Sequence, residues 1–199
     1  MRVPIQSASA EIEIKRSRFI AVAEYISEAH LIKERTLAMR KHHPGANHVV
    51  HAAVMGKKGS EFSLSDDHEP KNTAGRPALE VLKGSGITNI LVMIIRYFGG
   101  TKLGTGGLVK AYADATKAVL EVLKTEELVE KTAMKLVIGY DIYEQVKQLL
   151  IEVNAEITEE FTDEVTIRCN IPLSVAPEIT SQITDLSSGN ARITDLPAQ

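Results

Sequence analysis

The most distinct hydrophobic pattern in the chain is an unbroken apolar run that leads into a glycine-rich segment. Residues 90–95 are six consecutive apolar residues, which is long enough for a strand but short for a helix. A run without alternation is typical of a strand that is buried on both faces. Five glycines follow within residues 99–107. Beyond them, apolar residues return at helical spacing, at Leu108, Tyr112, Ala115 and Val119. This order predicts a buried strand, a glycine-rich loop and a helix.

The other patterns in the first 124 residues predict a mixture of strands and helices. Strands are indicated at residues 11–24 (one or two strands), 48–55 and 61–64. A helix is predicted from a Ser27 cap to about Lys41, and a second helix over residues 73–82. An acidic loop at residues 66–72 separates the third of these strand segments from the second helix.

The remaining residues predict a second domain. Residues 125–127 are interpreted as a short linker. The patterns after it give a strand (129–139), a helix (142–153), two strands (155–162 and 165–171), a helix (175–186) and a strand (191–196). This β-α-β-β-α-β order is the ferredoxin-like arrangement. We therefore predict an α+β chain of two domains, residues 1–124 and 128–199.

Cysteine content and the N-terminus indicate the compartment. The single cysteine, Cys169, shares one predicted strand face with Val165 and Ile167, which favours a core position over a nucleophile. One cysteine forbids an internal disulfide and suits a reducing compartment. The N-terminus has no secretory pattern, and the longest apolar run is far too short to span a membrane. We expect a cytoplasmic protein.

The net charge of −3 conceals an asymmetry between the two parts. Residues 1–124 hold 18 Lys and Arg against 12 Asp and Glu, which gives +6. Residues 125–199 hold 5 against 14, which gives −9. One interpretation is that two domains simply differ in surface charge. The other is that the first part attracts a polyanion, while the second repels it.

The glycine-rich loop is the first candidate site, because a loop between a strand and a helix start often presents backbone N–H groups to an anion. Gly104, Gly106 and Gly107 are expected to hold a backbone conformation that a side chain would disturb. Thr105 is placed to cap the following helix. The loop is not a Walker A motif, because no Gly-Lys-Ser/Thr follows at the required spacing. The alternative is a tight turn that packs the helix on the sheet. Positive charge around the loop would come from Arg76, Arg96, Lys102 and Lys110.

Carboxylates form the second candidate group. Asp66, Asp67 and Glu69 could bind a divalent cation or act as a base. The alternative is a solvated turn in which Asp66 or Asp67 caps a neighbour. Strand ends and helix starts converge at ligand sites of sheet proteins. This geometry would let one cleft collect side chains from three segments, namely Asp67, Glu69, Arg76, Arg96, Lys102 and Thr105, a set that is suggested by the family resemblance described below.

Histidines and aromatic residues add accessory candidates. His48 and His51 lie three residues apart on a predicted strand, so they point to opposite faces and are poorly placed to share one metal ion. No cysteine pair or His-x₃-His helix is present, and neither a metal nor a cofactor is expected. Arg96 and Tyr97 could offer a cation and an aromatic surface to a base, whereas Phe98 is expected to close the core.

The segments before and after the buried strand resemble the signature of the Impact/YigZ family. That signature has an acidic-Pro turn, a TAG-basic-Pro motif, an RY-aromatic-GG loop and an LG-x-GGLV-x-AY helix start. The matching positions are Asp67, Glu69, Pro70, Thr73–Pro77, Arg96–Gly100 and Leu103–Tyr112, about a quarter of the chain. One departure is His68, where most relatives carry glycine. If that position needs a positive φ, histidine there is unfavourable.

This resemblance implies the fold type of each domain. The N-terminal domain would have the β-α fold shared by the fourth domain of elongation factor G, certain RNA-binding ribosomal proteins and a class of small-molecule kinases. The C-terminal domain would be like the fifth domain of elongation factor G. The match also strengthens the case for Asp67 and Glu69, and His48 fits the family pattern. Eukaryotic Impact proteins restrain the activation of a translation-initiation kinase with an added N-terminal RWD domain. This sequence shows no such domain, so that activity is not carried over.

We interpret the chain as a non-catalytic regulator linked to translation or stress response, which binds RNA, the ribosome or a translation-associated protein. The link to translation comes from the resemblance and not from composition. The alternative is an enzyme or a small phosphate-ligand binder centred on the glycine-rich loop. A third class is a protein-interaction module without pocket chemistry.

Overall fold

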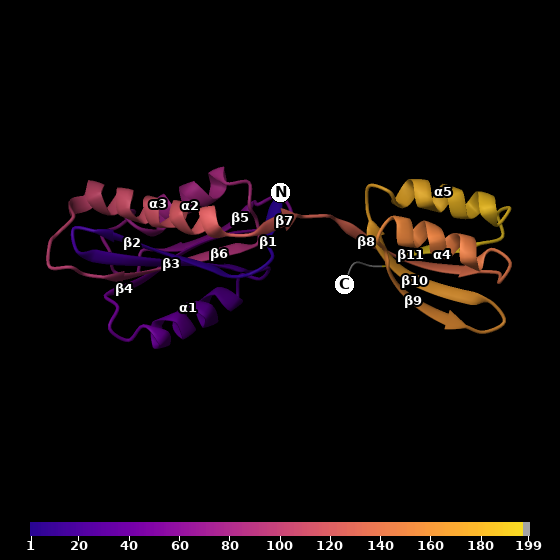
Figure 1. Cartoon of the computed structure of the whole chain (residues 1–199), viewed down its shortest axis with the longest axis horizontal. Helices are drawn as coiled ribbons and strands as arrows, with labels where there is room; N and C mark the ends of the chain where they lie inside the picture. Colours follow the sequence, from indigo (N-terminus) through magenta and orange to yellow (C-terminus); the bar gives the residue numbers. More distant parts are fainter. Residues whose placement is uncertain (197–199) are drawn as a thin grey trace. The chain divides into compact units, whose positions relative to one another are not determined.

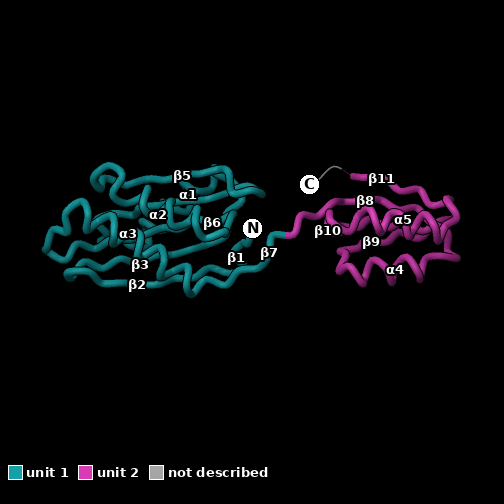
Figure 2. The backbone as a smooth tube through the Cα atoms, turned by 90° about the horizontal axis from the view of Figure 1, so that it is seen from above, with its two compact units in different colours: residues 1–128 teal, residues 129–199 magenta. Residues whose placement is uncertain are grey.

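The structure, a computed structural model, describes residues 1–196 of the chain. It is a mixed α+β protein that divides into two compact units, which Figure 2 colours separately. The first unit covers Met1–Leu128 and the second begins at Val129. Each unit has its own sheet and its own buried core.

The first unit is built on an antiparallel five-stranded sheet of order β2-β3-β6-β4-β5. Helices α2 and α3 cover one face and α1 lies on the other (Figure 1). The strands are β2 (Ala8–Ile14), β3 (Ser17–Tyr25), β4 (His48–Met55), β5 (Glu61–Ser65) and β6 (Ile90–Tyr97). The helices are α1 (Leu31–His42), α2 (Gly75–Gly84) and α3 (Gly104–Val122).

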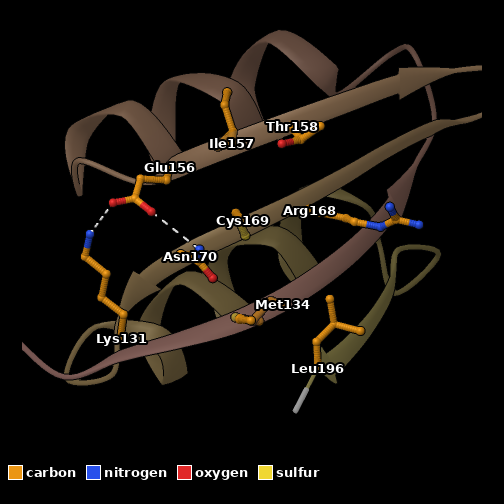
Figure 3. A pocket seen from close by; sticks show the side chains of 10 residues that line it. Lys131, Met134, Glu156, Ile157, Thr158, Arg168, Cys169, Asn170 and Leu196 are labelled. Carbon is orange, nitrogen blue, oxygen red and sulfur yellow. Dashed lines mark hydrogen bonds and ion pairs between the residues drawn. The ribbon is translucent and has the colours of Figure 1, made fainter. Parts of the chain in front are cut away.

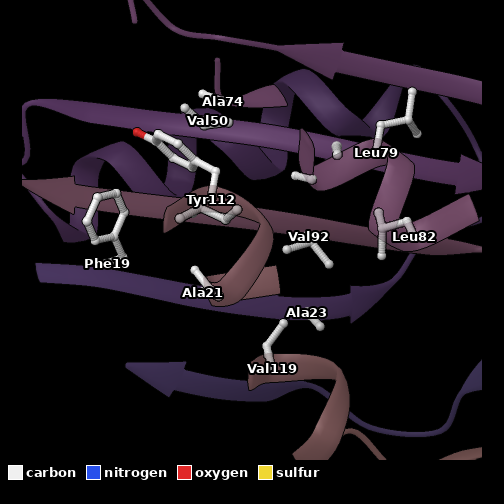
Figure 4. Close-up of a cluster of buried hydrophobic side chains, with 14 of the residues drawn as sticks. Phe19, Ala21, Ala23, Val50, Ala74, Leu79, Leu82, Val92, Tyr112 and Val119 are labelled. Carbon is white, nitrogen blue, oxygen red and sulfur yellow. The ribbon is translucent and has the colours of Figure 1, made fainter. Parts of the chain in front are cut away.

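Strand β6 is the apolar run of the sequence, and it lies in the centre of the sheet between β3 and β4. Alternate residues point to opposite faces of a strand. Ile90, Val92 and Ile94 therefore face α2 and α3, while Leu91 and Met93 face α1. The first unit thus has a hydrophobic core on each face of its sheet. Figure 4 shows the larger of these two cores, in which Val92 lies among side chains from α2, α3 and the neighbouring strands. The predicted burial on both faces is confirmed.

Two local predictions in the first unit are wrong. The segment Thr125–Glu127, which was expected to be a linker, is strand β7 and pairs with β1 (Arg2–Pro4) at the N-terminus. Its hydrogen bonds to β1 explain why three polar residues form a strand. Ser27 does not cap α1, because a turn precedes the helix, which begins at Leu31 after His30.

The second unit has the predicted β-α-β-β-α-β order, with an antiparallel sheet of order β11-β8-β10-β9. Both of its helices pack on one face of that sheet. The strands are β8 (Lys131–Ile138), β9 (Glu156–Phe161), β10 (Val165–Pro172) and β11 (Arg192–Leu196), and the helices are α4 (Tyr143–Glu152) and α5 (Ala176–Leu186). Cys169 is buried in this core, and burial raises the pKa of its thiol to about 11. It is therefore a core residue and a poor nucleophile.

Glycines around the predicted loop serve different purposes. A Cβ on Gly99 would collide with the backbone of Arg16, so this position requires glycine. Gly104 has φ +74°, which also favours glycine. Gly106 was expected to be constrained, but it lies in the first turn of α3 and a Cβ there would meet nothing within 4 Å. A Cβ on Gly107 would meet only Leu103 Cβ, at 3.1 Å.

Replacing Gly99 by alanine should therefore destabilise the first unit, because the added methyl group overlaps main-chain atoms that cannot move aside. Forced overlap of this kind costs about 1–3 kcal/mol. Gly106→Ala is the matched change in the first turn of α3, and it should be neutral or stabilising by up to about 1 kcal/mol, since alanine is the better helix former. Urea denaturation of the full chain measures both free energies of unfolding. Equal losses in the two variants would contradict the assignment of close approach to Gly99.

Candidate functional site

A cavity of about 430 Å³ opens in the first unit where the end of β6 meets the start of α3. It lies on the face of the sheet that carries α2 and α3. Four segments contribute side chains or backbone to its wall: the start of β4, the acidic loop, the end of β6 with the loop after it, and the first residues of α3. The lining residues are Asn47, His48, Glu69, Pro70, Arg96, Phe98, Lys102, Leu103, Gly104, Thr105 and Leu108.

A buried ion pair forms the polar floor of this cavity. Arg96 Nη1 donates to Glu69 Oε1 over 2.6 Å, and Tyr112 Oη donates to the same oxygen over 2.7 Å. The side chains of Glu69 and Arg96 are only 3% and 7% exposed. Burial, and then the hydrogen bond to Glu69, raise the pKa of Tyr112 far above its usual value. The tyrosine therefore remains a hydroxyl donor at any physiological pH.

Two aromatic rings lie close to the guanidinium group of Arg96. The Arg96 Cζ atom lies 5.5 Å from the ring centroid of Phe19 and 5.7 Å from that of Phe98. Phe19 in turn meets Tyr112 edge to face at 5.3 Å. Arg96 Nε is buried without a hydrogen-bond partner among the described residues. These contacts add to the ion pair in holding the Arg96 side chain in place.

His48 occupies the wall beside Glu69. Its Nδ1 lies 2.7 Å from the backbone carbonyl oxygen of Asp67. A carbonyl oxygen can only accept, so Nδ1 carries the proton and donates it. The other ring nitrogen, Nε2, lies 3.8 Å from Glu69 Oε1. The tautomer is thus set by the acidic loop, and Nε2 is the nitrogen directed to the ion pair.

The N-terminus of α3 opens into the same cavity without a capping side chain. The residue before the helix is Leu103, and no side chain of the described residues accepts a hydrogen bond from the first turn. Thr105 was expected to be the cap, but α3 begins one residue earlier, at Gly104. The first four N–H groups of a helix have no partner within the helix and carry partial positive charge. Lys102 adds a full charge beside them.

Helix α2 provides a contrast within the same unit. Asp66 accepts hydrogen bonds from the backbone N–H groups of Ala74 and Gly75 at its start, over 3.1 and 2.8 Å. It also accepts one from Asn72 N–H over 2.7 Å. Asp66 therefore caps the start of α2, which is one of the two roles that the sequence analysis considered for this residue. The chain fills the anion position of α2 with its own carboxylate and leaves that of α3 open.

Two residues near the site were missed by the sequence analysis. The glycine-rich loop packs on the two-residue turn between β2 and β3, where Arg16 has φ +66°. Arg16 Nη2 donates to Thr101 Oγ1 over 3.3 Å, which brings a further cation to the loop. Asn47 Oδ1 accepts a hydrogen bond from Phe98 N–H over 2.7 Å and fixes the loop exit from β6. The turn itself was detectable, because two strand patterns flank Lys15-Arg16, but its contact with residue 99 was not.

The structure brings six of the predicted site residues together and places the others elsewhere. Those that line the cavity are His48, Glu69, Arg96, Lys102, Gly104 and Thr105. Lys110, Gly106 and Gly107 also belong to α3 but do not line it. Arg76 points from the first turn of α2 to solvent, where Glu80 lies 3.8 Å away.

Asp67 and Tyr97 lie on the opposite side of the sheet, which corrects two of the predicted positions. The Asp67 carboxylate accepts from Val49 N–H over 2.6 Å and pairs with Arg40 of α1. Asp67 and His68 both have positive φ, and this turn directs the Asp67 carboxylate toward the α1 face. Tyr97 alternates with Arg96 along β6, so its hydroxyl meets His43 Nδ1 at 2.8 Å on the α1 side. Phe98, expected in the core, is 46% exposed.

A second cavity, of about 370 Å³, lies between α1 and β4–β5. His51 lines it, whereas His48 lines the first cavity, as the alternation of β4 predicted. His51 Nε2 lies 3.1 Å from Ser63 Oγ, and its Nδ1 is buried without a partner among the described residues. Burial lowers the pKa of His51, and the Asp67 carboxylate opposes this only in part. The ring is therefore neutral at pH 7.

Breaking the Glu69–Arg96 ion pair should lower the free energy of unfolding. Glu69→Gln leaves the buried Arg96 without its counter-charge, and such a loss destabilises a protein by about 3–5 kcal/mol. Tyr112→Phe removes one hydrogen bond to the carboxylate and should cost about 1.5–3 kcal/mol. Glu80→Gln is the control, because its ion pairs are exposed and worth at most about 1 kcal/mol. Thermal and urea unfolding measure all three. A Glu69→Gln variant as stable as Glu80→Gln would contradict the structural role of the pair.

The lowered pKa of His51 predicts a pH dependence of stability. The unfolded chain takes up a proton on this ring as the pH falls through about 6.5, while the folded protein does not. The stability linked to His51 is thus complete above that pH and declines as the pH falls below it. His51→Gln should lose less free energy of unfolding than the wild type between pH 7.5 and 5.5. His30→Gln, with an exposed ring, should behave as wild type. An unchanged pH dependence in His51→Gln would contradict this assignment.

No helix in the described part of the chain is long and apolar enough to cross a membrane.

Comparisons with known proteins agree with the resemblance seen in the sequence motifs. The sequence profile of the Impact N-terminal domain matches residues 15–120, and that of a domain of unknown function (DUF1949) matches residues 136–190. The chain is 38% identical to an IMPACT family member of Haemophilus influenzae over 156 residues, which cover 77% of this chain and 76% of the relative. It is 32% identical to the IMPACT family member YigZ of Escherichia coli over 194 residues, 96% of this chain and 95% of the relative. A crystal structure of a hypothetical protein superposes with a TM-score of 0.71 at 31% identity, covering 100% of this chain and 98% of that one. The chain is therefore a member of the Impact family.

Proposed function

We propose that this chain is a cytoplasmic, non-catalytic regulator linked to translation or stress response, and that its first unit binds RNA, alone or within the ribosome, through the cavity at the start of α3. The translation link rests on the family resemblance. We also assign the first unit to the fold of elongation factor G domain IV and its ribosomal-protein relatives. The strand order β11-β8-β10-β9 supports a ferredoxin-like assignment for the second unit.

The observation that carries this proposal is the open N-terminus of α3. The backbone N–H groups of the first turn have no capping side chain, and the cavity reaches the first two residues of that turn, Gly104 and Thr105. A phosphate group satisfies such donors and is favoured by the helix dipole. The starts of α1, α4 and α5 also lack a capping side chain, so the proposal depends on the adjoining cavity and on Lys102 as well as on the open end of α3.

Charge around the cavity favours an anionic polymer over a neutral ligand. The Glu69–Arg96 pair is neutral as a unit, so Lys102 and the helix end supply the positive potential within the cavity. Arg16 extends it along the adjoining turn. Residues 1–124 carry a net charge of +6. Attraction of this kind over a surface steers a polyanion to the site.

Phe98 offers a surface for a base. Its ring is 46% exposed at the cavity wall, and its inner side is supported by the Arg96 guanidinium group. Stacking of a base on an exposed aromatic ring contributes about 1–3 kcal/mol in single-strand binding and tolerates any sequence. A phosphate at the start of α3 with a base on Phe98 is thus a plausible pose for one nucleotide of a single strand.

The contacts of Glu69 Oε1 favour a structural role for this residue. A general base must be free to accept a proton from a substrate. Glu69 Oε1 already accepts from Arg96 and Tyr112, and both contacts are buried. We infer that the carboxylate is a structural anchor that holds Arg96 beneath the ligand.

A second candidate function is the binding of a small phosphate compound at the same place. The volume of the cavity, about 430 Å³, lies within the range of small-molecule pockets. His48 Nε2 and the α3 N-terminus would then contact one compact ligand.

Binding of a short single-stranded RNA to the full chain, followed by fluorescence anisotropy at several salt concentrations, tests the proposal. Affinity should fall steeply with salt. Lys102→Gln should weaken binding several-fold and reduce the salt slope by about 0.7, the value for one phosphate contact on a single strand. Lys117→Gln, which removes an exposed cation farther along α3, is the matched control and should bind RNA with nearly wild-type affinity.

Two outcomes would count against the RNA proposal. One is binding that does not depend on salt or on Lys102. The other is an absence of RNA binding together with a rise in melting temperature on adding a small phosphate compound, which would favour the second candidate.

A further inference from the structure

The second unit, although acidic overall, gathers its cations on one face of its sheet. The five Lys and Arg residues after residue 124 are Lys131, Lys135, Lys147, Arg168 and Arg192. Both helices pack on the face that carries Met134, Leu136, Val165 and Ile167. By strand alternation, four of the five cations lie on the opposite face, and only Lys147 belongs to a helix. Within this unit, no described helix covers that face.

The centre of this face is a row of donors that crosses all four strands. The register places Thr194 beside Lys135, Lys135 beside Arg168, and Arg168 beside Thr158. Two like charges directly opposite each other on a sheet are destabilising. Neither Lys135 nor Arg168 forms an ion pair with any residue from 1 to 196, whereas Lys131 pairs with Glu156 at 2.6 Å and Arg192 pairs with Glu164. The fold thus leaves its two central cations uncompensated.

A cavity of about 520 Å³ adjoins this row (Figure 3). Arg168 and Thr158 form one side of it, and the next row of the sheet, with Ala133, Asn170 and Leu196, forms its floor. Asn170 Nδ2 is engaged by Glu156 over 3.4 Å, as the dashed line in Figure 3 shows. The cavity therefore combines a cation and a hydroxyl at one side with small apolar surface and an amide beside them, and the Lys131–Glu156 ion pair lines it as well.

We propose that this face binds a nucleoside phosphate, with the phosphate at Lys135 and Arg168 and the nucleoside in the adjoining cavity. A guanidinium group and an ammonium group at neighbouring positions suit a phosphate, and the two threonine hydroxyls can donate to its remaining oxygens. The apolar floor of Ala133 and Leu196 provides contact area for a planar base. The cavity volume lies in the range of small-molecule sites.

The charge of the unit favours a small ligand over RNA at this face. Residues 125–199 have a net charge of −9, which repels a long polyanion from the surroundings of the site. A single phosphate is affected less, since charges beyond about 8 Å are largely screened at physiological salt. The site is separate from the cavity of the first unit, so the proposal does not depend on the RNA-binding function.

The test is calorimetric titration of the full chain with a nucleoside monophosphate, with the unphosphorylated nucleoside as the ligand control. Arg168→Gln and Lys135→Gln should each weaken binding about tenfold, the loss expected for one charge-assisted contact. Lys147→Gln removes the one cation of the unit that lies on a helix, α4, and not on this sheet face. It should leave the affinity for the nucleoside monophosphate unchanged. In a Lys102→Gln background, which weakens the candidate site of the other unit, Arg168→Gln and Lys135→Gln should still weaken binding about tenfold, which distinguishes this site from the candidate RNA site.

The melting temperature identifies variants that lose ligand binding because they are unfolded. Because the two central charges repel each other, Lys135→Gln and Arg168→Gln should melt at or above the wild-type temperature, so weak binding cannot be attributed to unfolding. Equal binding by wild type and Arg168→Gln would overturn the proposal, and so would a loss of binding in Lys102→Gln alone. Detectable binding of single-stranded RNA at this face, lost in Arg168→Gln, without binding of the mononucleotide, would overturn the assignment of ligand class.

Discussion

The buried contact of Glu69 with Arg96 and Tyr112 is the interaction on which the candidate site of the first unit depends. It joins the acidic loop, the last part of the central strand and helix α3 at a single carboxylate oxygen. Removing two charges from water is unfavourable unless they are paired and further hydrogen-bonded. Here the tyrosine hydroxyl and the rings around Arg96 provide that environment. The polar floor of the cavity is thereby held in place before any ligand binds.

Sequence patterns predicted those features of the fold that depend on local chemistry. The apolar run of β6, the helix after the glycine-rich loop and the element order of the second unit all follow from periodicity. Glu69, Arg96 and Lys102 could be grouped because they lie at strand ends and helix starts. Arg16 could not, because its place beside Thr101 depends on how the β2–β3 turn meets a loop 85 residues away.

The misplaced residues show which information a sequence lacks. Asp67 and Glu69 look alike as neighbouring acids, yet two residues with positive φ send Asp67 to the α1 face. His68 has φ +67°, so histidine adopts here, at some energetic cost, the left-handed conformation that glycine adopts more readily. The net charge of the second unit likewise does not predict how its charges are arranged. It conceals that four of the five cations of this acidic unit lie on one face of its sheet.

The pairing of β1 with β7 has a consequence for how the chain folds during synthesis. Arg2 lies opposite Glu127, so β1 has its strand partner among the last residues of the same unit. Contacts between such distant parts of a chain form late and slow folding. Until residues 125–127 are made, β1 has only its backbone bonds to Gly86 and Thr88, and the two-stranded sheet of the first unit forms when β7 emerges.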